Sequence, residues 1–183
     1  GMYNKVQNSP ARESYITFDI LGGDLTQSTG NARDLINSVL SSLNSIVANS
    51  WNGYYNALYQ VNNVISIVED LPESDLRNLI IGEAHYFRAY IYHSLVTRWG
   101  GVPIQRVNTM DKPFRDSEEA VWAFIEEELE TALAFLGTSS SCYYVSRDAA
   151  LALKARVMLE RGKKTEAAAL AEGLIKDGKY KLD

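Results

Sequence analysis

The segment from Leu76 to Arg98 most limits what this chain can fold into, because apolar residues recur in it every three or four positions. That period places them on one face of a helix about 37 Å long. Ser74 is positioned to cap its first turn, and Gly100 with Gly101 ends it, since glycine adopts the left-handed C-terminal cap without a side-chain clash. The repeating residues are Leu76, Leu79, Ile80, Ala84, Phe87, Ile91 and Leu95.

Other segments carry weaker helical signals of the same kind. Asp116 and Glu119 have the spacing of a capping box and predict the start of a helix that ends at Gly137. The acidic run Glu126–Glu130 in this helix is expected to face mostly water. The remaining predicted helices run from Asn31 through Val47, from Trp51 to Glu69, from Arg147 to Arg161 and from Lys164 to Asp177.

The last two of these segments form a helical hairpin that resembles one tetratricopeptide repeat. The unit from Ser146 to Lys179 has the repeat's period of about 34 residues, and its many alanines permit close helix contact. Six helices with glycine-terminated turns predict an all-α fold. We expect antiparallel helical pairs with tetratricopeptide-like packing, an α-α superhelix with long loops, in a single helical domain spanning residues 1–183.

Composition excludes several classes of function. The chain has 18 basic and 23 acidic residues and a formal net charge of −5, so no nucleic-acid partner is expected. The single cysteine, Cys142, cannot form an internal disulfide, and two histidines leave little for a zinc site. The apolar run Ala120–Ile125 is far shorter than the roughly 18 residues of a membrane-spanning helix. We expect no metal and no cofactor.

The histidines also fail to form a catalytic group. His85 and His93 lie more than two helical turns apart, whereas ligands on one helix need a spacing of three or four residues to reach one ion. Ser94 follows His93 directly, and adjacent helical residues point in different directions, so this pair does not form a nucleophile with its base. The sequence predicts a protein that is not an enzyme.

Two long stretches resemble the SusD-like (SusD/RagB) family. They are WNGYYNALYQVNNVI from Trp51 and GEAHYFRAYIYHSLVTRWGGVPI from Gly82, and the segments 117–136 and 146–182 follow in the family's order. Within these motifs we interpret Gly82 as allowing close helix contact, and Glu83 and Arg88 as forming ion pairs or capping neighbouring turns.

The resemblance implies a glycan-binding lipoprotein on the outer-membrane surface of Bacteroidetes that works with a SusC-like TonB-dependent transporter and catalyses nothing. Family members are considerably longer, so the chain is expected to be the N-terminal SusD-like portion of a longer protein, with a naturally short member of the family as the alternative. On this interpretation, membrane association depends on a lipid anchor that this chain lacks.

Ligand contacts in this family come mainly from loops, so the binding residues are predicted from loop positions. Two groups are expected to contact glycan: Asp24, Asn31 and Arg33, and then Asn49, Trp51 and Asn52. An exposed aromatic ring can stack on a sugar while amides and charged groups bond its hydroxyls. The alternative is a tetratricopeptide-like scaffold that binds a peptide or protein in the groove between helix pairs.

Overall fold

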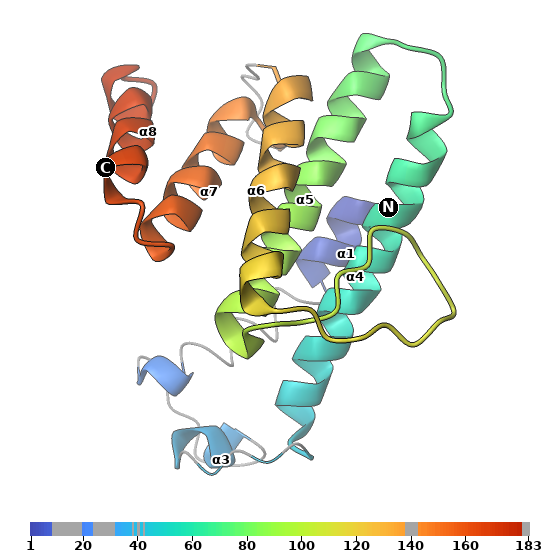
Figure 1. The fold of residues 1–183 in the computed structure, drawn as a ribbon, viewed down its shortest axis with the longest axis vertical. Coiled ribbons are helices and arrows are strands. Elements are labelled where there is room, and N and C mark those ends of the chain that lie inside the picture. The colour runs from blue at the N-terminus through green and yellow to red at the C-terminus, as the bar shows by residue number, and fades with distance from the viewer. Residues whose placement is uncertain are drawn as a thin grey trace. The chain divides into compact units, whose positions relative to one another are not determined.

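The computed structural model describes residues 1–8, 20–23, 32–37, 39, 41, 43–137 and 143–180, and within these ranges the regular structure is helical, with no strand. The all-α prediction is therefore confirmed (Figure 1). Two compact units, residues 1–60 and 61–183, are described separately below. The single domain spanning residues 1–183 stays a prediction. The helices are α1 (Met2–Asn8), α3 (Ala32–Ile36), α4 (Ser45–Glu69), α5 (Asp75–Trp99), α6 (Glu118–Phe135), α7 (Arg147–Glu160) and α8 (Lys164–Lys176).

The first unit corrects the predicted helix from Asn31 through Val47. The helix α3 ends at Ile36, and α4 begins at Ser45, six residues before its predicted start. The side chain of Asn44 explains the new boundary, because its Oδ1 accepts a hydrogen bond of 3.0 Å from the backbone N–H of Ile46. Val47 then joins Ile46 in packing against the buried Leu35.

The helix α5 has more buried residues than α6, α7 or α8. Its predicted ends are confirmed in position: the Ser74 side chain accepts a hydrogen bond from the Arg77 N–H, and Gly100 ends the helix with a φ of 67°. The ψ of Gly100, −128°, differs from that of the predicted left-handed cap. Between Ile81 and Val96 only Tyr86 and Tyr90 are not buried. The apolar stripe predicted from the sequence is therefore part of a helix that is covered on nearly all sides.

Helices α5 to α8 pack in chain order, with α6 against α5, α7 against α6 and α8 against α7. Consecutive helices run antiparallel (Figure 1), which confirms the predicted tetratricopeptide-like pairs. Gly162 turns the chain between α7 and α8 with a φ of 75°, and Ala150 and Ala167 are buried. Buried alanines of this kind permit close contact between helices.

The contact between α5 and the end of α6 requires the absence of a side chain at Gly82. A Cβ at this position would lie 2.8 Å from the Cγ of Leu136 and 3.1 Å from its backbone nitrogen. Gly82 is buried as well. Its predicted role in close helix contact is therefore confirmed.

The start of α6 differs from the prediction by one residue. Ser117, not Asp116, is the N-cap, and its side chain accepts a hydrogen bond from the Ala120 N–H. Asp116 has a different partner: its Oδ2 accepts a hydrogen bond of 2.8 Å from the Ile104 N–H, across the connector between α5 and α6 (residues 100–117). The helices in the described ranges are all too short or too polar to cross a bilayer.

Candidate functional site

An exposed face of α4 in the first unit carries three carboxamides. Asn49, Asn52 and Asn56 are all exposed, and their spacing of three and then four residues places them on one side of the helix. Each carboxamide offers a donor group and an acceptor oxygen. Such a row can bond the alternating hydroxyl donors and acceptors of a sugar.

Aromatic rings lie beside this row on the same helix. The rings of Trp51 and Tyr55 are half-buried and contact each other, with centroids 5.0 Å apart and planes inclined by 41°. Tyr59, one turn further along, is 51% exposed. The face therefore combines flat apolar groups with amides, which is the chemistry of a sugar-binding surface.

Three predicted glycan contacts, Asn49, Trp51 and Asn52, lie inside α4 and not in a loop, which corrects the position expected for them. Asn49 and Asn52 share the exposed face of α4, with Trp51 at its edge. Arg33 is exposed on the short helix α3. The other two predicted residues, Asp24 and Asn31, lie outside the described residues, and the glycan-binding roles of all six residues stay predictions.

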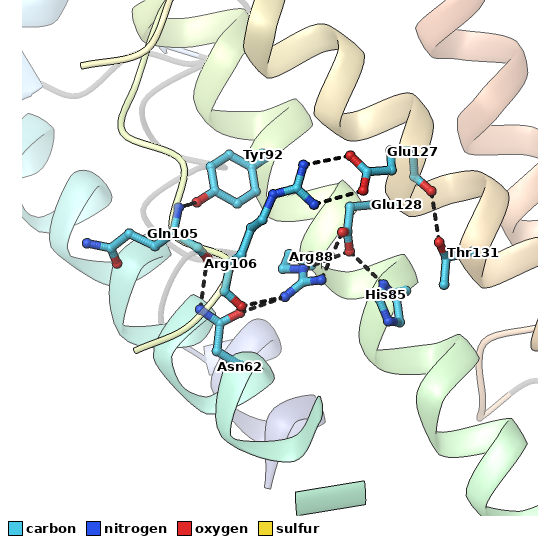
Figure 2. A network of polar contacts seen from close by, with 9 residues as sticks. All are labelled: Asn62, His85, Arg88, Tyr92, Gln105, Arg106, Glu127, Glu128 and Thr131. Carbon is cyan, nitrogen blue, oxygen red and sulfur yellow. Dashed lines mark hydrogen bonds and ion pairs between the residues drawn. The ribbon is translucent and has the colours of Figure 1, made fainter. Parts of the chain in front are cut away.

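A buried polar network centres on Arg88 of α5 in the second unit (Figure 2). Its guanidinium binds the Glu128 carboxylate through two bonds, Nε to Oε2 at 2.7 Å and Nη2 to Oε1 at 2.8 Å. Its Nη1 donates to the Asn62 Oδ1 at 3.2 Å and to the Arg106 carbonyl at 2.9 Å. His85 Nδ1 lies 2.8 Å from Glu128 Oε2. The proposed structural role of Arg88 is confirmed.

The same network fixes the connector between α5 and α6. Asn62 Nδ2 donates to the Gln105 carbonyl at 2.9 Å, and the Gln105 N–H donates to the Tyr92 hydroxyl at 2.6 Å. The Tyr92 hydroxyl in turn donates to the Pro103 carbonyl at 3.3 Å. Burial raises the pKa of Tyr92, so the phenol remains protonated and keeps this donor.

An open pocket of about 490 Å³ lies between the connector and the C-terminal part of α4, within the second unit. Polar residues from both segments line it: Asn62, Asn63, Ser66, Glu69, Arg106 and Asn108. The Asn108 Nδ2 donates to the Asn63 Oδ1 at 2.8 Å across the pocket. Sequence reasoning did not predict this pocket, because its walls come from segments about 45 residues apart.

Most of the acidic run of α6 keeps contact with water, with Glu127 and Glu130 exposed and Glu126 half-buried, but Glu128 departs from the prediction. Glu128 is 2% exposed, because it lies three residues after Ile125 and four before Ala132, on the buried side of the helix. Each other acidic residue of the run pairs with a basic side chain: Glu126 with Arg161 and Lys163, Glu127 with Arg106, and Glu130 with Lys154. The run therefore links α6 to the connector and to the helices that follow.

Burial and charged neighbours together set the pKa values of Glu127, Glu128 and His93. Burial by itself raises the pKa of Glu128, but hydrogen bonds from His85 and Arg88 outweigh it and lower that pKa overall. The pKa of Glu127 is lowered by its hydrogen bonds from Arg106. For His93, burial lowers the pKa more than the 2.6 Å contact with Glu160 raises it. At neutral pH Glu127 and Glu128 are ionised and His93 is neutral.

We expect the free energy of unfolding to fall as the pH is lowered from 7.5 to 5.5 and to fall again below about pH 4.5. In the first interval the unfolded chain takes up a proton at His93 more readily than the folded chain, because the pKa of His93 is lower in the folded state. In the second interval the unfolded chain protonates Glu127 and Glu128 more readily, because the pKa values of these two groups are also lower in the folded state. Urea unfolding across this pH range measures both steps. The variant His93→Gln should flatten only the first step, and an unchanged slope would contradict the assignment.

Neither histidine belongs to a metal site in the described part of the chain. No group of three His, Cys, Asp or Glu side chains there could hold a metal ion. His85 and His93 instead contact different carboxylates, Glu128 on α6 and Glu160 on α7. These contacts join helices.

Comparison with known proteins gives a consistent set of relatives. A family profile named SusD-like, described as "Starch-binding associating with outer membrane", matches residues 1–159. A SusD-like protein of Formosa agariphila is 29% identical over 158 residues, which cover 83% of this chain and 31% of that protein.

Solved structures match along the whole chain. A SusD superfamily protein from Bacteroides vulgatus has a TM-score of 0.87 at 20% identity, covering 100% of this chain and 43% of its own. A protein crystallised with a xylogluco-oligosaccharide also has a TM-score of 0.87, at 25% identity, covering 100% of this chain and 40% of its own. The chain thus spans less than half the length of these proteins.

Proposed function

Because this chain belongs to the SusD-like family, which is described as starch-binding and associating with the outer membrane, we propose that it binds a glycan without transforming it. The family match over residues 1–159 is the observation that carries this proposal. A similar protein was crystallised with a xylogluco-oligosaccharide, which supports an oligosaccharide as the ligand class.

The exposed face of α4 is the surface we propose for glycan contact. Asn49 and Asn52 would bond sugar hydroxyls, and Tyr59 would stack on a ring, with Trp51 and Tyr55 supporting the edge of the face. Arg33, Asp24 and Asn31 complete the proposed set. Few polar contacts and shallow stacking give modest affinity for a single sugar unit, so a chain of several units is the expected ligand.

The whole protein would work at the cell surface. We propose that it is part of an outer-membrane lipoprotein that passes its glycan to a SusC-like TonB-dependent transporter. The site needs no nucleophile or general acid for this task, because the ligand is carried and not cleaved. The net charge of −5 argues against a nucleic-acid partner in the same role.

Titration of the 183-residue chain with xyloglucan-derived oligosaccharides, followed by calorimetry, tests the proposal. We expect Asn49→Ala combined with Asn52→Ala to weaken binding about tenfold, since each lost hydroxyl bond contributes on the order of 0.5–1.5 kcal/mol. Tyr59→Ala should weaken it by a similar factor through lost stacking.

The control variant is Glu172→Ala, an exposed change on α8 that removes only a surface ion pair with Lys176. It should leave binding unchanged. A panel of neutral and acidic polysaccharides that shows no binding at all would refute the glycan proposal. Release of reducing ends from any of them would refute the non-catalytic role.

A further inference from the structure

The pocket beside the connector shares no residue with the proposed glycan face of α4. We propose that this pocket is a second saccharide subsite, one that takes a neutral, hydroxyl-rich sugar unit. The inference rests on the proposed glycan-binding function. It adds a separate place on the chain where one unit of the glycan is held, and it specifies the charge of that unit.

The size and lining of the pocket fit a small polar ligand. Its volume of about 490 Å³ falls within the range of roughly 300–1,000 Å³ that is usual for small-molecule sites. Asn63, Ser66 and Glu69 of α4 present an amide, a hydroxyl and a carboxylate, and together these groups donate to and accept from hydroxyls. Ile65 and Val107 add apolar surface on which the C–H groups of a sugar can rest.

Both walls are held in place before any ligand arrives. On the connector side, the backbone carbonyl of Arg106 accepts a bond from the buried Arg88, and the carbonyl of Gln105 accepts one from Asn62. The bond from Asn108 to Asn63 orients the two carboxamides toward each other. A site whose groups are already ordered loses less entropy on binding, which strengthens weak hydroxyl contacts.

The charges around the pocket select against an acidic sugar. Two arginines line it, yet Glu128 neutralises Arg88 through two hydrogen bonds, and Glu127 neutralises Arg106 through two more, at 2.8 and 2.6 Å. Glu69 then adds a negative charge to the lining. A uronate or sulfate would meet this carboxylate, while both arginines of the lining already bind glutamates, so a neutral unit binds better.

Side-chain amide signals in a two-dimensional ¹H–¹⁵N spectrum of the 183-residue chain give a direct test. The probes are a xyloglucan heptasaccharide, which is neutral, and an oligogalacturonate, which is anionic. We expect the neutral probe to shift the side-chain signals of Asn63 and Asn108, and the anionic probe to leave both unchanged.

A matched pair of variants separates binding in the pocket from other effects. Ser66 and Ile67 are neighbouring exposed residues of α4, but only Ser66 lines the pocket. Ser66→Tyr should fill the pocket and weaken the titration measured at Asn63 and Asn108 about tenfold or more, whereas Ile67→Tyr should not change it. Because both positions are exposed, both variants should keep the unfolding temperature of the parent chain.

The other possible results separate failure of the second subsite from failure of the proposed function. Shifts at Asn49 and Asn52 without shifts at Asn63 and Asn108 would overturn the second subsite and leave the proposed function intact. No shift anywhere with either probe or with the polysaccharide panel would overturn both. Equal shifts of Asn63 and Asn108 with oligogalacturonate, or equal titrations in the two tyrosine variants, would also overturn the inference.

Discussion

Arg88→Ala should destabilise the chain by about 3–5 kcal/mol, the usual cost of removing one partner from a buried ion pair. Glu128 is 2% exposed and would keep a charge without the guanidinium that binds both of its oxygens. The Arg106 carbonyl and the Asn62 side chain would each lose a hydrogen bond as well. Urea unfolding at pH 7.5 measures the loss.

Arg106→Ala is the matched control, because the two arginines bind adjacent glutamates of α6 in the same two-bonded way. The Arg106–Glu127 pair differs in exposure, with both side chains 54% exposed. Pairs that remain in water contribute only about 0–1 kcal/mol, so Arg106→Ala should have a small effect. Equal losses in the two variants would show that burial does not set the strength of the Arg88 pair.

A double-mutant cycle makes the prediction independent of how well Arg88→Ala folds. Glu128→Gln keeps the shape of the side chain but removes its charge, which leaves Arg88 as the uncompensated group. The combined Arg88→Met and Glu128→Gln variant removes both charges and should lose less stability than the sum of its two single changes. Additive losses would mean that the two side chains do not stabilise each other.

The helix boundaries that the sequence predicted well are those set by local contacts. Ser74 and Ser146 cap α5 and α7 with hydrogen bonds to the N–H three residues ahead, and Gly100 and Gly162 have the positive φ angles that glycine allows. Such contacts depend on residues within one turn, so a single sequence reveals them. The boundary near Asn44 was missed because Asn44 sits between two apolar segments whose helical spacing continues across it.

The polar network could be predicted only in part. The motif around Arg88 indicated a structural residue, but its partner Glu128 lies 40 positions away. One signal was available in the sequence: of the acidic run, Glu128 alone falls midway between Ile125 and Ala132 on the apolar stripe. The pocket could not be predicted from the sequence in this way, because it forms only where the connector lies against α4.

Gly101→Ala should cost about 3 kcal/mol, at the upper end of the range for overpacking, because backbone atoms fill the space that a side chain needs. A Cβ at Gly101 would overlap the carbonyl oxygen of Asp116 and lie 3.0 Å from the Glu118 nitrogen. The two ends of the connector cross at this point, and the Asp116 N–H donates to the Val102 carbonyl at 3.3 Å. An added methyl group would push these ends apart.

Alanine substitutions at two other glycines show whether steric overlap causes the loss of stability expected for Gly101→Ala. Gly100→Ala should cost about 1–2 kcal/mol through its backbone, because a φ of 67° with a ψ of −128° is rarely adopted by L residues, whereas a Cβ there would meet nothing closer than 3.4 Å. Gly173→Ala, inside α8 with nothing within 4 Å of a Cβ, should stabilise by about 0.5–1 kcal/mol. Thermal and urea unfolding of the three variants should therefore rank them in this order. If Gly101→Ala proved no more harmful than Gly100→Ala, the connector ends would not approach as closely as described, and the fixed wall of the second subsite would lose its support.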